Sequence, residues 1–230
     1  SDALPAQALD CGADLVAQST HKLLGSLTQT SMLHVRTRRV DIERVRTAAS
    51  LLQSTSPDYL LLASLDIARM QMATEGWQRM ERTVRLARSL RQRINSLPGL
   101  WCFGPEEMRT PGANGLDETK LTVQVRGLGI TGAQAEYILR HTYKIQCELA
   151  DAWNVLFLLS MADTERETEL LYKALAGLAK GKRESVTAVS ARSLPPIPSM
   201  RLVPREAFFA PSHSVPIQEA LHKTVAEAIT

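Results

Sequence analysis

The chain has 230 residues, of which 44% are hydrophobic and 22% charged, and its formal net charge is +3. This composition is ordinary for a globular protein, and so small a charge gives no argument for a nucleic acid or a membrane surface as partner. No apolar run approaches the about 18 residues that a membrane span needs, and no basic and apolar leader opens the chain. The three cysteines, Cys11, Cys102 and Cys147, lack C-x-x-C spacing. They indicate reduced thiols, so we expect a cytoplasmic protein without a disulfide framework or a metal site.

The first predicted elements surround a lysine. Residues 4–12 predict a short helix closed by a glycine, and residues 14–18 and 31–35 predict two buried strands. The loop between the strands carries the sequence Ser-Thr-His-Lys at residues 19–22, with Gly25 as a flexible point. A lysine flanked by hydroxyls and a histidine, just after a strand, is a candidate covalent anchor for an anionic cofactor. A surface lysine without a chemical role is the alternative.

Three helical segments follow. Asp41 is expected to cap a helix over residues 42–53. Residues 59–74 are apolar on most sides and predict a buried helix, with a bend at Gly76. Residues 77–97 show an amphipathic pattern with a row of arginines beside its apolar face, and we favour a solvated helix face over a phosphate contact for this row. The arginines of the row are Arg79, Arg82, Arg85, Arg88 and Arg91.

A smaller α+β unit is predicted downstream. Thr131 is expected to cap a helix over residues 132–143, and Thr164 and Glu167 form a capping-box pattern at the start of a helix over residues 164–179. The predicted strands are short apolar or alternating runs at residues 100–103, 120–126, 145–149 and 154–160. A proline-containing linker and two short helical patterns close the chain.

Six stretches of the chain, in order, resemble one family. They lie at residues 14–22, 29–34, 54–57, 117–121, 145–151 and 204–210. Together they are similar to the bacterial ornithine/lysine/arginine decarboxylases, pyridoxal-phosphate enzymes of the aspartate-aminotransferase fold. The resemblance covers almost the whole chain. It implies an α/β fold, namely the C-terminal part of a pyridoxal-phosphate fold-type I large domain followed by a small α+β domain.

The resemblance also implies how the chain is divided. Residues 1–75 would be the C-terminal part of the cofactor-binding large domain, 76–182 the small domain, 183–203 a linker and 204–230 the start of a C-terminal extension. In this family a phosphate loop, a ring-stacking histidine and an Asp-x-x-His segment precede the lysine. Because the sequence contains none of them before its lysine, we expect a segment cut from a longer enzyme at both ends.

The resemblance assigns the site residues. Lys22 would be the Schiff-base lysine of pyridoxal 5'-phosphate, and Ser19 and His21 would bind the cofactor phosphate through a hydroxyl and an imidazole NH. A loop histidine held by the backbone is the alternative for His21. Thr55 and Ser56 stand at an expected helix start, where they would either reach the phosphate of the partner subunit or simply cap the helix.

Other polar residues have weaker functional signals. His34 is expected to be a core or interface histidine. Glu148 and Asp151 could select a cationic substrate side chain, with solvated carboxylates as the favoured alternative. We expect Asp117 and Lys120 to form a turn and the start of a strand rather than to take part in chemistry.

The leading hypothesis is pyridoxal-phosphate-dependent decarboxylation of arginine, lysine or ornithine by a homodimer or higher homo-oligomer. The alternative is a catalytically incomplete fragment that acts as a dimerisation or scaffold segment, because the aspartate that pairs with the pyridine nitrogen is not found and the ring would be a poor electron sink without it. A nucleic-acid partner is not expected, since aromatic residues make up only 5% of the chain and do not interleave with the basic ones.

Overall fold

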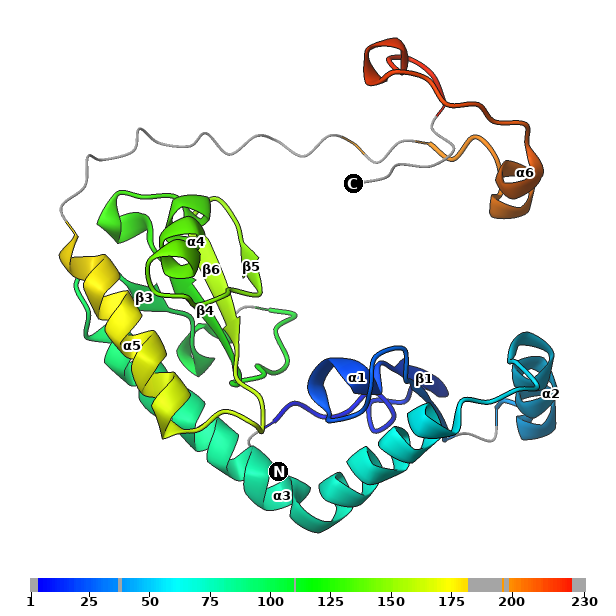
Figure 1. Cartoon of the computed structure of the whole chain (residues 1–230), viewed down its shortest axis with the longest axis horizontal. Helices are drawn as coiled ribbons and strands as arrows, with labels where there is room; N and C mark the ends of the chain where they lie inside the picture. Colours follow the sequence, from blue (N-terminus) through cyan, green and yellow to red (C-terminus); the bar gives the residue numbers. More distant parts are fainter. Residues whose placement is uncertain (1–3, 37–38, 110, 182–195, 197–198, 225–230) are drawn as a thin grey trace. The chain divides into compact units, whose positions relative to one another are not determined.

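The computed structural model describes residues 4–36, 39–109, 111–181, 196 and 199–224. The chain divides into two compact units, Ser1–Val189 and Ser190–Thr230. The strands are β1 (Leu15–Gln18), β2 (Met32–Val35), β3 (Trp101–Cys102), β4 (Lys120–Gln124), β5 (Leu149–Ala150) and β6 (Asn154–Leu158). The α-helices, drawn in Figure 1, are α1 (Thr20–Leu23), α2 (Ile42–Leu52), α3 (Tyr59–Asn95), α4 (Gly132–His141), α5 (Glu165–Lys180) and α6 (Pro204–Phe209).

Strands β1 and β2 form a two-stranded antiparallel sheet, in which Leu15 lies opposite Val35 and Gln18 opposite Met32. Both strands were predicted, but the prediction that they are buried is wrong: Leu15 is 42% exposed and Leu33 52%. Among the described residues these strands pair only with each other, so their apolar side chains stay partly open to solvent.

The helix predicted for residues 4–12 is also absent. The chain forms turns here, in which the backbone amides of Asp10 and Cys11 both donate to the carbonyl of Gln7. So short a segment makes too few helical hydrogen bonds to offset the entropy of nucleation. Gly12, with φ of +95°, closes these turns instead of the predicted helix.

Helices α2 and α3 begin at aspartate caps. The side chain of Asp41 accepts hydrogen bonds from the amides of Glu43 and Arg44, as predicted, and Asp58 caps α3 in the same way. Helix α3 is continuous over 37 residues, although the sequence predicts two helical segments with a bend at Gly76. Figure 1 shows that α3 bends along its course.

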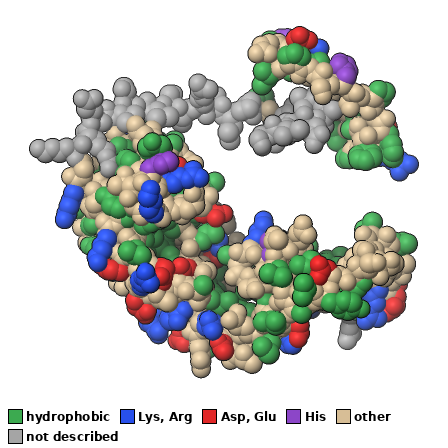
Figure 2. All heavy atoms as spheres, in the orientation of Figure 1, with side chains coloured by type: hydrophobic (Ala, Val, Ile, Leu, Met, Phe, Trp, Pro, Cys, Tyr) green, Lys and Arg blue, Asp and Glu red, His purple; other side chains and the backbone are tan. Residues whose placement is uncertain are grey.

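The first half of α3 does not form the predicted buried helix. Tyr59 is 78% exposed, Leu60 75% and Ile67 59%, whereas Ala68 is buried. Figure 2 shows hydrophobic side chains at the surface over α2 and this half of α3. An apolar pattern predicts that a helix is buried but does not identify what buries it. The described residues bury only a narrow stripe of the first half of α3.

The core lies in the second half of the first unit. Strands β3, β4, β6 and β5, in that order, form an antiparallel sheet in which Leu121 lies opposite Phe157. Alternate residues of β4 and the position after it, Leu121, Val123 and Val125, are fully buried, which confirms the predicted alternation. Helices α3, α4 and α5, the other strands and the connections between them contribute the remaining members of this core cluster.

Two details of this unit follow from local geometry. The strand expected at residues 145–149 begins only at Leu149, because Lys144 has φ of +59° and the amide of Ile145 donates to Leu139 at the end of α4. Gly132 lets α4 approach the β5–β6 turn: a Cβ atom there would lie 2.3 Å from the carbonyl oxygens of Asp151 and Asn154.

The predicted helix caps of the small domain are confirmed. Thr131 accepts a hydrogen bond from the amide of Gln134 at the start of α4, and Thr164 and Glu167 form the expected capping box at the start of α5. Each cap satisfies amides that have no partner inside the helix.

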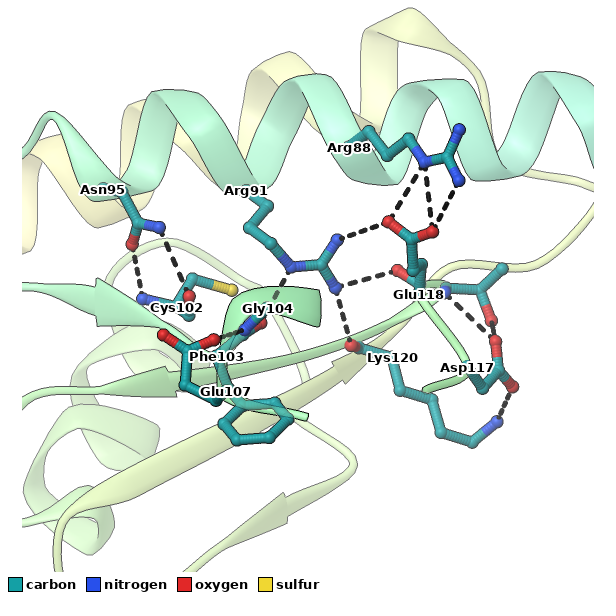
Figure 3. Close-up of polar contacts among 11 residues, drawn as sticks. Arg88, Arg91, Asn95, Cys102, Phe103, Gly104, Glu107, Asp117, Glu118 and Lys120 are labelled. Atoms are coloured by element: carbon teal, nitrogen blue, oxygen red, sulfur yellow. Dashed lines mark hydrogen bonds and ion pairs between the residues drawn. The ribbon is translucent and has the colours of Figure 1, made fainter. Parts of the chain in front are cut away.

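The arginine row is only in part a solvated helix face. Arg91 is only 5% exposed and donates to the carbonyl oxygens of Phe103 (2.8 Å), Glu118 (3.0 Å) and Lys120 (3.2 Å), as Figure 3 shows. Arg88 binds both carboxylate oxygens of Glu118, at 2.6–3.1 Å. The row therefore joins α3 to the ends of the strands, where carbonyl groups outside the sheet need donors.

Arg82 extends this arrangement toward α5. It donates to the carbonyl oxygens of Met161 (2.9 Å) and Asp163 (3.2 Å). Arg85, by contrast, is exposed and makes no ion pair or hydrogen bond with the described residues. The prediction of a solvated face thus holds for Arg85 and is wrong for Arg82 and Arg91.

The second unit contains α6 and a short 3₁₀ helix, Ile217–Glu219, at the two predicted helical patterns. The rings of Phe208 and Phe209 meet edge to face, with centroids 5.1 Å apart. Most of the predicted linker and the last six residues lie outside the described residues. Among the residues that are described, no helix is long and apolar enough to cross a membrane.

Candidate functional site

The candidate lysine lies on α1, a single helical turn that directly follows β1. Thr20 is buried and its hydroxyl donates to the carbonyl of Gln18 (3.3 Å), while the amide of Lys22 donates to the carbonyl of Ser19 (3.2 Å). These contacts fix the turn and leave the side chains of Ser19 and Lys22 exposed. The ammonium group of Lys22 has no ion pair or hydrogen bond with any described residue, so it is accessible to a ligand.

His21 is half-buried and held by the backbone. Its Nδ1 lies 2.7 Å from the carbonyl oxygen of Thr30. The other ring nitrogen, Nε2, has no hydrogen-bond partner in the described part of the chain. The structure therefore supports the backbone-held alternative for His21, and a phosphate contact through Nε2 would require a proton on that nitrogen as well.

Three hydroxyl side chains support the loop that follows α1. Thr30 is 3% exposed, and its hydroxyl lies 2.7 Å from Ser26 Oγ and 2.6 Å from the carbonyl oxygen of Leu27. The amide of Leu27 donates to Ser64 Oγ on α3 (3.2 Å). This hydrogen bond attaches the loop that follows Lys22 to the first half of α3.

Thr55 and Ser56 lie in the exposed connection between α2 and α3. The alternative that Thr55 and Ser56 cap the helix is wrong, because Asp58 is the residue that caps α3 at its expected start. The amide of Ser56 instead donates to Ser54 Oγ (3.0 Å). No contact among the described residues joins Thr55 or Ser56 to Lys22, so a role for them requires a group from outside this set.

The other polar residues of interest have structural partners. His34 is half-buried on β2, and its Nε2 lies 2.9 Å from Gln18 Oε1, so it is not a core histidine. Asp151 accepts hydrogen bonds from the amides of Trp153 and Asn154 in the β5–β6 turn. Desolvation raises the pKa of Asp151, but hydrogen bonds from Asn154 and Trp153 outweigh it and the net pKa is lowered.

Asp117 also serves a turn, as predicted. Its carboxylate accepts from the amide and hydroxyl of Thr119 (3.1 and 2.6 Å) and pairs with Lys120 at the start of β4. Glu148 is exposed, and no contact of its carboxylate links it to Lys22. The substrate-selecting role considered for Glu148 and Asp151 gains no support from this geometry.

Sequence reasoning missed Gln29 and Thr30. Gln29 has φ of +70°, a conformation for which glycine or asparagine would have been the sequence signal. Thr30 contributes a backbone oxygen to His21, and a backbone contact leaves no signature in residue type. The arrangement offers a primary amine that can react with an aldehyde and, next to it, an imidazole and a hydroxyl that can bind an anion.

Comparisons with known proteins concern the family and the fold of the chain. The family model described as Orn/Lys/Arg decarboxylase, major domain, matches residues 2–111. An arginine decarboxylase of Halalkalibacterium halodurans is 45% identical over 230 residues, covering 99% of this chain and 47% of the relative. The chain spans about half the length of the curated relatives it matches.

Solved structures are similar in fold. The constitutive lysine decarboxylase of E. coli matches with a TM-score of 0.61 at 23% identity, covering 71% of this chain and 28% of that one. An alanine–glyoxylate aminotransferase of Nostoc sp. matches with a TM-score of 0.56 at 20% identity, covering 77% and 51%. The predicted fold class, the C-terminal part of a fold-type I large domain followed by a small α+β domain, is therefore confirmed.

Proposed function

Because the chain belongs to the Orn/Lys/Arg decarboxylase family, we propose that it takes part in the pyridoxal-phosphate-dependent decarboxylation of arginine, lysine or ornithine to the corresponding amine. Two observations support this proposal. The relative from Halalkalibacterium halodurans is named an arginine decarboxylase. Lys22, the expected covalent anchor, is exposed and has no competing partner among the described residues.

The residues of α1 fit an aldehyde cofactor with a phosphate group. The amine of Lys22 is accessible, His21 has one ring nitrogen held and one available, and the Ser19 hydroxyl makes no helix-capping bond. When bound, pyridoxal 5'-phosphate supplies an electron sink for the carbanion that loss of carbon dioxide leaves.

Each residue has a distinct part in this proposal. Lys22 Nζ would hold the cofactor through its aldehyde group, because a primary amine can react with an aldehyde. The Ser19 hydroxyl, and His21 Nε2 when it carries a proton, would donate to the phosphate oxygens. Thr55 and Ser56 contact the phosphate in a partner subunit, a role that their exposed position permits.

Lys22 in this geometry is the observation that carries the proposal, and its substitution is the test. Release of labelled carbon dioxide from carboxyl-labelled arginine, lysine and ornithine is measured for the protein, for Lys22→Arg and for Lys173→Arg. Lys173 is a matched control because it is an exposed lysine on α5, in the small domain. We expect Lys22→Arg to lose at least about a thousandfold in rate and Lys173→Arg to keep the parent rate.

The same assay distinguishes the proposed function from the alternative function. A protein that binds itself tightly but releases no carbon dioxide from any of the three amino acids would favour a dimerisation or scaffold segment. Equal activity of Lys22→Arg and the parent protein would reject Lys22 as the anchor.

We further infer a homodimer or higher homo-oligomer in the cytoplasm. The exposed apolar side chains of α2 and α3, among them Leu52 and Leu60, support a covering partner. The thiols Cys102 and Cys147 are free, which fits a reducing compartment. The division at residues 75 and 76 is likewise a proposal, supported by the core cluster, whose members all lie between Ala87 and Leu178.

A further inference from the structure

The second unit, drawn from orange to red in Figure 1, surrounds an open cavity of about 770 Å³. The residues that line it lie in three stretches of the chain, within 199–202, 207–212 and 222–224. Small-molecule sites in proteins have volumes of about 300–1,000 Å³. The cavity is therefore large enough for a small organic molecule.

The charged side chains among the described residues that line this cavity are all basic. They are Arg201 and Lys223, and His222 adds an imidazole. The guanidinium of Arg201 and the ammonium of Lys223 make no ion pair or hydrogen bond with a described residue, although the same unit contains Glu206 and Glu219. Positive charges that line one cavity without a carboxylate attract an anion into it.

Hydroxyl groups and apolar side chains complete the lining. Ser199, Ser212 and Thr224 each carry a hydroxyl that makes no hydrogen bond with another described residue, so each can donate to an anion. The terminal oxygens of a phosphate group accept several such bonds at once, and a guanidinium can donate two of them in parallel. The apolar side chains offer a surface to a hydrocarbon part of the ligand, and they are Leu202, Ala207, Ala210 and Pro211.

We propose that this cavity is a binding site for an organic phosphate, that is, a phosphate group joined to an apolar body. Arg201 and Lys223 pair with the phosphate oxygens, and the apolar body packs against Leu202 and Ala210. The site lies in the second unit and includes no residue of the Lys22 loop, so it is independent of the proposed function.

Naphthyl phosphate is a suitable probe, because it joins a phosphate group to an apolar ring system. Its binding to the whole chain is measured by isothermal titration calorimetry beside three molecules that each lack one feature. Naphthol lacks the charge, inorganic phosphate lacks the rings, and naphthoate carries a carboxylate in place of the phosphate. We expect the dissociation constant of naphthyl phosphate to be at least about tenfold lower than that of each of the three, the effect of about one charge-assisted hydrogen bond.

Variants of the two cations test where the probe binds. Arg201→Gln and Lys223→Gln should each raise the dissociation constant about tenfold, whereas Lys223→Arg, which keeps the charge, should stay within about threefold of the parent protein. Arg205→Gln is the matched control and should keep the parent affinity. Arg205 lies in the same unit and is exposed, but its guanidinium lies over the ring of Phe209, 5.5 Å from the centroid, and it does not line the cavity. Circular dichroism verifies that each variant folds.

The remaining control is Ser19→Ala, which separates this site from the proposed cofactor site. An affinity that falls in Ser19→Ala and stays unchanged in both cavity variants would overturn the proposal, because the probe would then bind beside Lys22. Binding of naphthyl phosphate no tighter than that of the three comparison molecules would overturn it as well. Equal losses in Arg205→Gln and in the cavity variants would indicate general attraction to a basic surface and would also contradict it. Tight binding that only the cavity variants lose would support the site even if the protein released no carbon dioxide from any amino acid, so the proposed function can fail separately.

Discussion

Replacing Arg91 by methionine tests how α3 is fixed to the small sheet. Methionine keeps most of the apolar stem of arginine but removes every donor. The carbonyl oxygens of Phe103, Glu118 and Lys120 would lose a charged hydrogen-bond donor in a site where Arg91 is only 5% exposed. The carboxylate of Glu118 would also lose an ion pair with Arg91, whose Nη1 lies 3.7 Å from Glu118 Oε2.

The expected cost follows from these contacts. A hydrogen bond to a charged group contributes about 1.5–3 kcal/mol, and breaking a buried ion pair costs about 3–5 kcal/mol. These contributions overlap, and Arg88 still neutralises Glu118 in the variant (Figure 3). We therefore expect the free energy of unfolding to fall by about 3 kcal/mol, near the lower end of the buried-pair range.

Urea unfolding followed by tryptophan fluorescence measures this loss. For an m-value of about 3 kcal/mol/M, the midpoint should move down by about 1 M. Arg85→Met is the matched control, since Arg85 lies on the same helix, is exposed and makes no contact with another element in the described chain. Its free energy of unfolding should change by less than about 0.5 kcal/mol. If the free energy of unfolding fell by less than about 1 kcal/mol for Arg91→Met, or equally for both variants, this would refute the claim that buried Arg91 fixes α3 to the sheet.

Three further predictions concern the small domain. Gly132→Ala should destabilise the protein by more than about 2 kcal/mol in the same urea assay, because its Cβ would lie 2.3 Å from two backbone oxygens; a loss under about 0.5 kcal/mol would contradict the close approach of α4. Iodoacetamide at pH 8 should modify the exposed Cys11 and spare Cys102 and Cys147 until urea is added, since burial raises the pKa of both buried thiols to about 11; rapid triple labelling of the folded protein, seen by mass spectrometry, would contradict this. Asp117→Asn should cost about 1 kcal/mol near pH 7. Desolvation raises the pKa of Asp117, but hydrogen bonds from Lys120 and Thr119 lower it on balance, so this stability is present above the usual value of 3.8 and lost as the pH falls below it. A cost that does not shrink on acidification would refute the last prediction.

Local signals predicted much of the fold. The caps at Asp41, Thr131 and Thr164 and the alternation of Leu121 and Val123 were all readable, because each depends on residues within about four positions or on a two-residue period. The strand order β3-β4-β6-β5 and the burial of Arg91 could not be predicted from such local signals. Arg91 meets Glu118 27 residues away, and no local pattern distinguishes an arginine that faces strand ends from one that faces solvent.

The candidate site was predicted only in part. The chain-long resemblance identified Lys22 and its neighbours, and the structure shows Lys22 exposed and His21 held beside it. The Thr30 carbonyl and the positive φ of Gln29 could not be read, because they are backbone properties of residues whose types do not require them. The exposed first half of α3 was misjudged because an apolar pattern does not say what covers a helix.

Reductive trapping at Lys22 tests the central claim most directly. The protein is incubated with about equimolar pyridoxal 5'-phosphate, reduced with borohydride and digested, and the modified lysine is located by mass spectrometry, with Lys22→Arg in parallel. We expect one modified peptide carrying the label on Lys22 and no label at that stoichiometry in the variant. Equal labelling of other exposed lysines such as Lys173, or labelling unchanged in Lys22→Arg, would contradict the account.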